Sequence, residues 1–207
     1  KMVKQRSATL VRKNKQLLEM LNEVKKGQKL KEEVLIAKKV QESFLPKELP
    51  DSKKIDISAF LEAAQYVGGD YYDVFYGNDG SLNIIIADVS GHGIGPSITM
   101  STFRGVCRSL FALSLTFDEQ LYLINNLMCE DSKNEEFFIT GFFVKYYEDK
   151  NRLEYISAGH NEMLYYDSNI KKLNKFTSTA IPLGIFSNTK FLPKSQKTNK
   201  DDILVLY

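Results

Sequence analysis

Ile84-Ile-Ile-Ala-Asp88-Val-Ser-Gly91-His92-Gly93 is the stretch of this 207-residue chain that decides its fold. The run of isoleucines predicts a buried strand, and this strand delivers Asp88 to its tip. The two glycines that follow permit a sharp turn, and residues 94–113 then have the pattern of a helix. A carboxylate at the end of a buried strand is costly unless a cation or hydrogen bonds compensate it. Asp88 is therefore a candidate metal ligand, and a cap for the following helix is its alternative role.

A second acidic segment, Val67-Gly-Gly-Asp70-Tyr-Tyr-Asp73, lies upstream between two predicted strands. Its paired glycines let the backbone turn tightly, so that Asp70 can project from a strand end. Mg²⁺ and Mn²⁺ prefer carboxylate, carbonyl and water oxygens, often with only one or two carboxylates each. Asp70 and Asp88 together predict the nucleus of such a site. The alternative is that Asp70 and Asp73 are simple turn formers.

The remaining pattern from residue 51 onward predicts one layered α+β domain. Asn78-Asp79-Gly80 is a hairpin signal, and Thr116-Phe-Asp-Glu119 has the spacing of a helix capping box. Strands followed by two helices and then further strands favour stacked antiparallel layers over βαβ winding. The predicted strands are 55–60, 81–88, 137–147, 153–158, 163–166 and 203–207, and the predicted helices are 94–113 and one that begins near Thr116.

The first 45 residues form a separate, helical segment. Val3, Leu10, Leu17 and Val24 recur every seven residues, and the phase of the apolar pattern shifts near Gly27. Two interpretations stay open: a solvated helix that packs on its own domain, or a dimerising, coiled-coil-like signalling helix. Prolines at positions 46 and 50 end the helix, so the predicted domains are residues 1–45 and 46–207.

Composition restricts the classes of partner and compartment. The net charge is +2 and the pI is about 8.4, with the basic excess concentrated in the first 31 residues, so a nucleic-acid partner is not expected. Cys107 and Cys129 have no metal-ligand spacing and are interpreted as ordinary buried thiols in a reducing compartment. No signal peptide or membrane-spanning run is visible, so we expect a cytoplasmic protein, with tethering through an upstream membrane or sensor segment as the alternative.

Gly68-Gly-Asp70-Tyr-Tyr-Asp73 followed by Asp88-Val-Ser-Gly-His-Gly93 resembles the signature of the PPM (type 2C) protein phosphatases. More narrowly, it is similar to the bacterial SpoIIE/RsbU-like branch. Further segments fall in the family's order, so that the resemblance covers residues 37–207. They are Ala37-Lys-Lys-Val-Gln41-Glu-Ser-Phe-Leu-Pro46, Phe138-Ile-Thr140-Gly-Phe-Phe, Ser157-Ala-Gly-His160-Asn and Pro182-Leu-Gly184-Ile.

The resemblance implies an α-β-β-α sandwich of two antiparallel sheets flanked by helices, with two Mn²⁺ or Mg²⁺ ions at one edge. It implies that Asp88 contacts both ions, that Asp70 is a ligand beside it, and that the carbonyl of Val89 is a further ligand. Asp73 would orient water at the metals. Gly91 and His92 have uncertain roles: His92 either hydrogen-bonds water or phosphate at the site, or caps the turn.

The implied function is hydrolysis of phosphoserine or phosphothreonine on a regulatory protein, an anti-sigma-factor antagonist, by water that the two metals activate. The family's Thr-Asp-Gly segment and a later aspartate, both metal ligands, do not appear before Tyr207. We therefore expect the natural protein to continue beyond this residue. An upstream sensor domain is one alternative for what precedes the helix. The alternative function is a catalytically inactive regulatory scaffold that acts through the amino-terminal helix.

Three other features are interpreted structurally. His160 is expected to be a satisfied structural histidine rather than a general acid. Arg104 and Arg108, one helical turn apart, either form a solvated face or steer phosphoprotein substrates. A nucleotidyl cyclase signature also begins with Gly-Gly-Asp, but Tyr71 stands where that chemistry requires an acidic residue.

Overall fold

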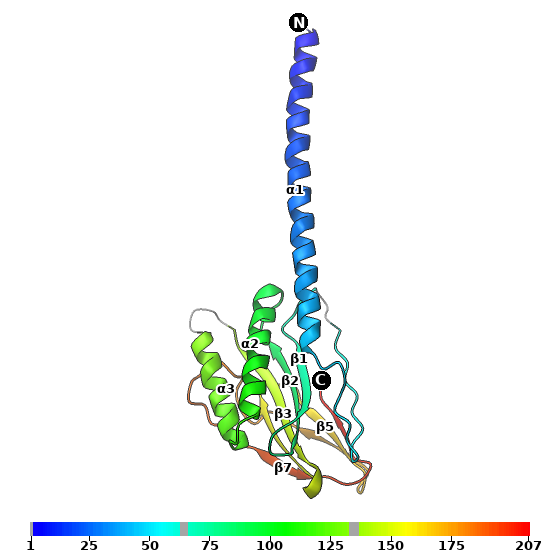
Figure 1. The fold of residues 1–207 in the computed structure, drawn as a ribbon, viewed down its shortest axis with the longest axis vertical. Helices are drawn as coiled ribbons and strands as arrows, with labels where there is room; N and C mark the ends of the chain where they lie inside the picture. Colours follow the sequence, from blue (N-terminus) through cyan, green and yellow to red (C-terminus); the bar gives the residue numbers. More distant parts are fainter. Residues whose placement is uncertain (1, 63–65, 133–136) are drawn as a thin grey trace. The chain divides into compact units, whose positions relative to one another are not determined.

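The computed structural model describes residues 2–62, 66–132 and 137–207, and the chain divides into two compact units, residues 1–40 and 41–207. Helix α1 (Met2–Phe44) accounts for the first unit and continues into the second (Figure 1). It runs through Gly27 without interruption, so the predicted helix is confirmed and the phase shift does not break it. In the described part of the chain, no helix combines the length and apolar character needed to cross a membrane.

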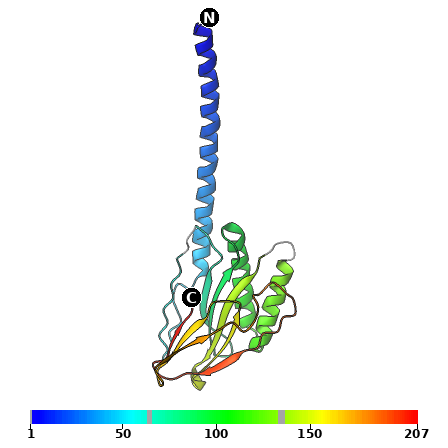
Figure 2. The ribbon, with the colours of Figure 1, turned by 180° about the vertical axis from the view of Figure 1, so that it is seen from behind.

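The second unit contains two antiparallel sheets (Figures 1 and 2). Sheet A has the order β1-β2-β3-β4-β7 and sheet B has the order β6-β5-β8. Helices α2 (Ile94–Phe111) and α3 (Phe117–Asp131) connect β2 to β3. The strands are β1 (Tyr71–Tyr76), β2 (Leu82–Val89), β3 (Ile139–Tyr147), β4 (Arg152–Ala158), β5 (Met163–Asp167), β6 (Lys172–Phe176), β7 (Lys194–Lys197) and β8 (Ile203–Val205), and η1 (Glu148–Lys150) is a short 3₁₀ turn between β3 and β4.

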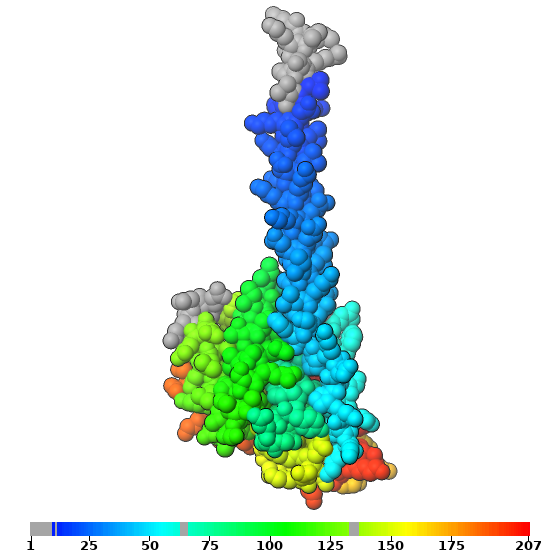
Figure 3. Space-filling view, in the orientation of Figure 1, coloured from blue at the N-terminus to red at the C-terminus, as the bar shows by residue number. Residues whose placement is uncertain are grey.

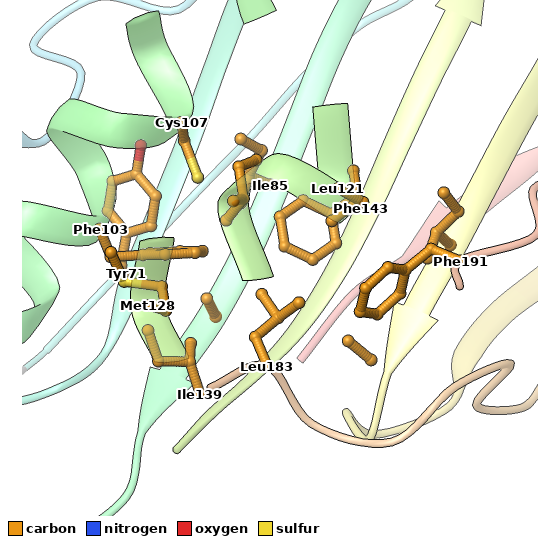
Figure 4. Packing of buried hydrophobic residues seen from close by; sticks show 14 of the residues in the cluster. Tyr71, Ile85, Phe103, Cys107, Leu121, Met128, Ile139, Phe143, Leu183 and Phe191 are labelled. Atoms are coloured by element: carbon orange, nitrogen blue, oxygen red, sulfur yellow. The ribbon is translucent and has the colours of Figure 1, made fainter. Parts of the chain in front are cut away.

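Alternate residues of β2 face two different cores. Ile85 and Val89 belong to the core that sheet A shares with α2 and α3, where residues of both helices point toward the strands (Figure 4). Ile84 and Ile86 pack on the opposite face, in the core that contains Tyr155 of sheet A and Met163 of sheet B. The domain therefore has one helical layer and two sheet layers. Successive side chains of a strand point to opposite faces, so a sheet covered on both faces has apolar side chains on both.

Helix α3 begins at the capping box that the sequence predicted. Thr116 and Glu119 form the capping box of α3, and the main-chain N–H of Thr116 donates to Glu119 Oε2 at 2.8 Å. The side chains of α2 and α3 form one continuous surface in the space-filling view (Figure 3). Cys107 is buried in the core beneath α2, and both Cys107 and Cys129 are free thiols.

The prediction of a strand over residues 55–60 is wrong. This segment is irregular, although Ile55 and Ile57 pack half-buried against the core between the sheets. Ser52 Oγ accepts hydrogen bonds from the main-chain N–H groups of Lys54 and Ile55, which turns the chain at that point. The alternation of apolar residues thus indicated burial correctly but did not indicate pairing with a neighbouring strand.

Candidate functional site

Asp70 and Asp88 lie opposite each other at the end of the β1–β2 ladder. Tyr71 pairs with Ala87, so the next position along each strand places Asp70 across from Asp88. Both side chains are exposed, and the Asp70 carboxyl group lies near enough to affect the pKa of Asp88. The pKa of Asp88 is raised, mainly because the carboxyl group is partly buried and to a smaller extent because of the negative charge of Asp70. The two acids that the sequence singled out are therefore brought together.

Gly69 allows the chain that carries Asp70 to approach the end of β2 closely. The main-chain N–H of Val89 donates to the Gly69 carbonyl at 3.3 Å. A Cβ at Gly69 would lie 2.5 Å from the Val89 carbonyl oxygen, whereas a Cβ at Gly68 would meet only the nitrogen of Asp70, at 4.0 Å. The Val89 carbonyl thus lies against Gly69, the residue before Asp70, in a contact that only glycine permits.

The loop after β2 is fastened to the start of β3. Ser90 N–H donates to the Phe138 carbonyl at 2.9 Å, and Phe138 N–H donates to Ser90 Oγ at 3.0 Å. Gly91 has φ +96°, a left-handed conformation that places it in the turn before α2. His92, the next residue, has an exposed side chain.

Thr140 and His160 join this group, and sequence reasoning missed both as site residues. Thr140 pairs directly with Asp88 across β2 and β3, and its Oγ1 lies 2.9 Å from His160 Nδ1. Burial lowers the pKa of His160, and the nearby Asp70 carboxylate opposes that shift. Both residues stood in quoted motifs, but only the strand register places them beside the acids.

Asp73 takes a different place from the one predicted. It stands three residues after Asp70, and an odd spacing along a strand puts two side chains on opposite faces. Its buried carboxylate accepts bonds from Arg108 Nε at 2.6 Å and from the Tyr71 hydroxyl at 2.6 Å. Arg108 Nη2 binds the other oxygen of Asp73. The prediction that Asp73 orients water at the metals is therefore replaced by a structural ion pair between β1 and α2.

Arg104 likewise has a structural partner. Its Nε donates to the carbonyl of Phe44 at 2.8 Å, and its guanidinium lies over the Phe44 ring, 5.2 Å from the centroid. Neither arginine of the pair therefore belongs to a purely solvated face, because Arg108 is engaged by Asp73.

The oxygen groups at the site fit a hard divalent cation. They are the carboxylates of Asp70 and Asp88 and the main-chain carbonyl of Val89, and Mg²⁺ or Mn²⁺ commonly binds through one or two carboxylates with carbonyl and water oxygens. Within the described ranges, no three His, Cys, Asp or Glu side chains gather into a metal cluster. Partial burial, and after it the charge of Asp70, raises the pKa of Asp88, and a cation between the two carboxylates would oppose both effects.

Comparisons with known proteins agree with this arrangement. Residues 78–207 match the sequence family described as Stage II sporulation protein E (SpoIIE). Phosphoserine phosphatase RsbU of Bacillus subtilis is 32% identical over 180 residues, which are 87% of this chain and 53% of that protein. Phosphoserine phosphatase RsbP of the same organism is 26% identical, over 86% of this chain and 44% of that protein. This chain thus spans about half the length of these relatives.

A solved structure shows the same fold at lower identity. The SiaA-PP2C domain of Pseudomonas aeruginosa superposes with a TM-score of 0.69 at 12% identity, covering 86% of this chain and 71% of that one. The family match extends over more than half of the chain and includes the strand end that carries Asp88. The chain therefore belongs to the SpoIIE family, and it has the α+β fold of the PP2C-type domains.

Proposed function

We propose that this protein is a metal-dependent protein serine/threonine phosphatase that acts on a phosphorylated regulatory protein. The observation that carries the proposal is the Asp70–Asp88 pair, which the strand register places opposite each other at neighbouring strand ends. Membership of the SpoIIE family supports it, because two relatives are named phosphoserine phosphatases. Similarity to the SpoIIE/RsbU-like branch supports an anti-sigma-factor antagonist as the phosphoprotein.

In the proposed reaction, Asp70, Asp88 and the Val89 carbonyl hold two Mn²⁺ or Mg²⁺ ions. When bound, such ions lower the pKa of a water molecule and neutralise phosphate oxygens, which favours in-line attack at phosphorus. The chain contributes a fixed set of oxygen ligands. Gly69 holds the Val89 carbonyl close to the strand of Asp70, and the Ser90–Phe138 bonds hold the loop that follows. Pre-formed ligands of this kind need no rearrangement when the substrate arrives.

We also propose that α1 forms a parallel homodimer that transmits an upstream signal. Leu10, Leu17, Leu21 and Val24 are each more than half exposed, at 61%, 54%, 55% and 57%. A row of exposed apolar side chains at heptad spacing is typical of a helix that pairs with another helix. Analytical ultracentrifugation of the protein with and without residues 1–30 tests this, since removal should convert dimer to monomer. A monomer in both samples would contradict the proposal.

Phosphate release from a phosphoserine protein tests the proposed activity. The natural full-length protein should release phosphate with Mn²⁺ and not with EDTA, and Asp88→Asn should lose most of the activity. Asp56→Asn, at an exposed carboxylate outside the site, serves as the control. Equal rates for wild type and Asp88→Asn would contradict the proposal, and no Mn²⁺-dependent release from either would favour the regulatory scaffold.

A further inference from the structure

Thr140 connects His160 to the main chain of Asp88. Because Asp88 and Thr140 are direct partners in an antiparallel ladder, their side chains lie on the same face of sheet A. Thr140 Oγ1 lies 3.5 Å from the main-chain oxygen of Asp88 and 2.9 Å from His160 Nδ1. One hydroxyl group thus bridges the end of β4 and the part of β2 that carries the candidate metal ligands.

The direction of these bonds follows from the hydrogens available. A threonine hydroxyl donates one hydrogen, and the Asp88 carbonyl can only accept, so Thr140 donates to it. His160 Nδ1 must then carry the hydrogen that Thr140 Oγ1 accepts, which leaves Nε2 as an acceptor. His160 Nε2 is buried and has no hydrogen-bond partner within ordinary geometric limits among the described residues.

The backbone that presents His160 is fixed on several sides. Gly159 has φ +65°, and its N–H lies 2.9 Å from both the Ala180 carbonyl and Ser178 Oγ. A Cβ at this position would lie 2.5 Å from Pro182 Cγ, so the turn is packed as tightly as glycine allows. The main chain just before His160 is therefore held by two hydrogen bonds and by close packing against Pro182.

We propose that His160, acting through Thr140, is a positioning residue for the metal ligands at the end of β2. The inference rests on the proposed metal site at Asp70 and Asp88. Strand β2 ends at Val89, one residue after Asp88, and the main chain beyond it is held by the bonds of Val89 to Gly69 and of Ser90 to Phe138. The chain from His160 to Thr140 adds a long, 3.5 Å side-chain bond to the Asp88 carbonyl, which lies between the Asp88 carboxylate and the Val89 carbonyl in sequence. His160 therefore acts here as a hydrogen-bonding support and not as a proton donor to substrate.

Isothermal titration of Mn²⁺ into the natural full-length protein, without substrate, tests this role. Thr140→Val keeps the shape and removes the hydroxyl, and it should weaken Mn²⁺ binding by about tenfold or more, as loss of a supporting hydrogen bond does at metal sites. Thr140→Ser should restore most of the affinity. His160→Ala should weaken binding similarly, and His160→Asn, which places an amide near the position of Nδ1, should restore part of it. Thr102→Val is the matched control, because that hydroxyl makes a 3.4 Å bond to the Ile98 carbonyl on α2.

The outcomes separate this inference from the proposed function. If wild type binds Mn²⁺ and Thr140→Val binds it equally well, the positioning role is wrong while the metal site stands. Equal weakening by Thr140→Ser and Thr140→Val would also contradict the role, because the hydroxyl would then not matter. If wild type binds no Mn²⁺, the proposed metal site fails, and this inference fails with it. Should His160→Ala not fold by near-ultraviolet circular dichroism, the Thr140 pair decides alone.

Discussion

Gln41 and Gly68 are joined by two hydrogen bonds: Gln41 Nε2 donates to the Gly68 carbonyl at 2.7 Å, and Gly68 N–H donates to Gln41 Oε1 at 3.2 Å. One side chain in the last turn of α1 thus satisfies both main-chain groups of a residue two positions before Asp70. The Gln41 amide has one donor and one acceptor that match the N–H and C=O of Gly68. A substitution at Gln41 should therefore loosen the segment that carries Asp70, a candidate metal ligand.

Gln41→Ala should lower the free energy of unfolding by about 1–3 kcal/mol, because two partly buried main-chain groups lose their partners. Urea unfolding followed by circular dichroism measures the change. Gln16→Ala, at an exposed position of the same helix, is the control and should leave stability nearly unchanged. Equal stability of the two variants would show that the paired hydrogen bonds contribute nothing.

Gly69→Ala and Gly68→Ala should behave differently although they are neighbours. A methyl group at Gly69 would lie 2.5 Å from the Val89 carbonyl oxygen, so that oxygen must move, whereas Gly68 has room for a methyl group. Gly69→Ala should therefore destabilise the fold by roughly 1–3 kcal/mol and weaken Mn²⁺ binding. Gly68→Ala should do neither. Thermal unfolding and Mn²⁺ titration of both variants check this, and similar behaviour of the two would contradict the close approach.

Arg108→Ala should leave the Asp73 carboxylate buried without its cation. The Asp73 side chain is fully buried while that of Arg108 is 38% exposed, so the ion pair is partly screened. Even so, removal of one partner should cost on the order of 3 kcal/mol. In the double variant Asp73→Asn with Arg108→Ala, part of this loss should be recovered, since no charge is then left unpaired. A full double-mutant cycle with zero coupling would contradict the pairing.

Asp88 should contribute a loss of stability to the metal-free protein as the pH rises through the acid range, against opposite contributions from Asp79 and Asp202, whose pKa values are lowered. Burial and the neighbouring Asp70 raise the pKa of Asp88, so the folded state binds more protons than the unfolded state between the ordinary and the raised value. The stabilising contribution of Asp88 is therefore fully present below the ordinary pKa of an aspartate and is lost as the pH passes the raised one. Asp88→Asn should flatten this decline, so that the metal-free variant is more stable than wild type at neutral pH. Calorimetry in EDTA across this range measures it, and an unchanged decline in Asp88→Asn would refute it.

The sequence predicted the strand end at Asp88, the hairpin before it and the capped start of α3, because these depend on local signals such as β-branched runs, turn residues and a capping box. It also predicted that Asp70 and Asp88 form the nucleus of one metal site, and the structure places these two residues opposite each other. The two acids meet because their strands pair in one register, which the sequence suggests but does not specify.

The wrong and missed predictions have one physical cause, because each depends on contacts between segments that are distant in sequence. Asp73 was grouped with Asp70 by closeness in sequence, but a spacing of three along a strand turns it toward α2 and Arg108. Thr140 and His160 belong to the site only through cross-strand pairing with β2 and the turn after β4. Residues 55–60 alternate like a strand, yet they lie beside the core without pairing. The spacing of apolar residues indicates which side chains are buried, but it does not indicate which segment of the chain packs or pairs with them.

The central claim is that Asp70 and Asp88 together hold a divalent cation. Electron paramagnetic resonance of Mn²⁺ mixed with the natural full-length protein at neutral pH measures bound and free ion directly. We expect bound Mn²⁺ with wild type and with Asp56→Asn, and little or none with Asp70→Asn or Asp88→Asn. Undiminished binding by both site variants, or no binding by wild type, would contradict the account.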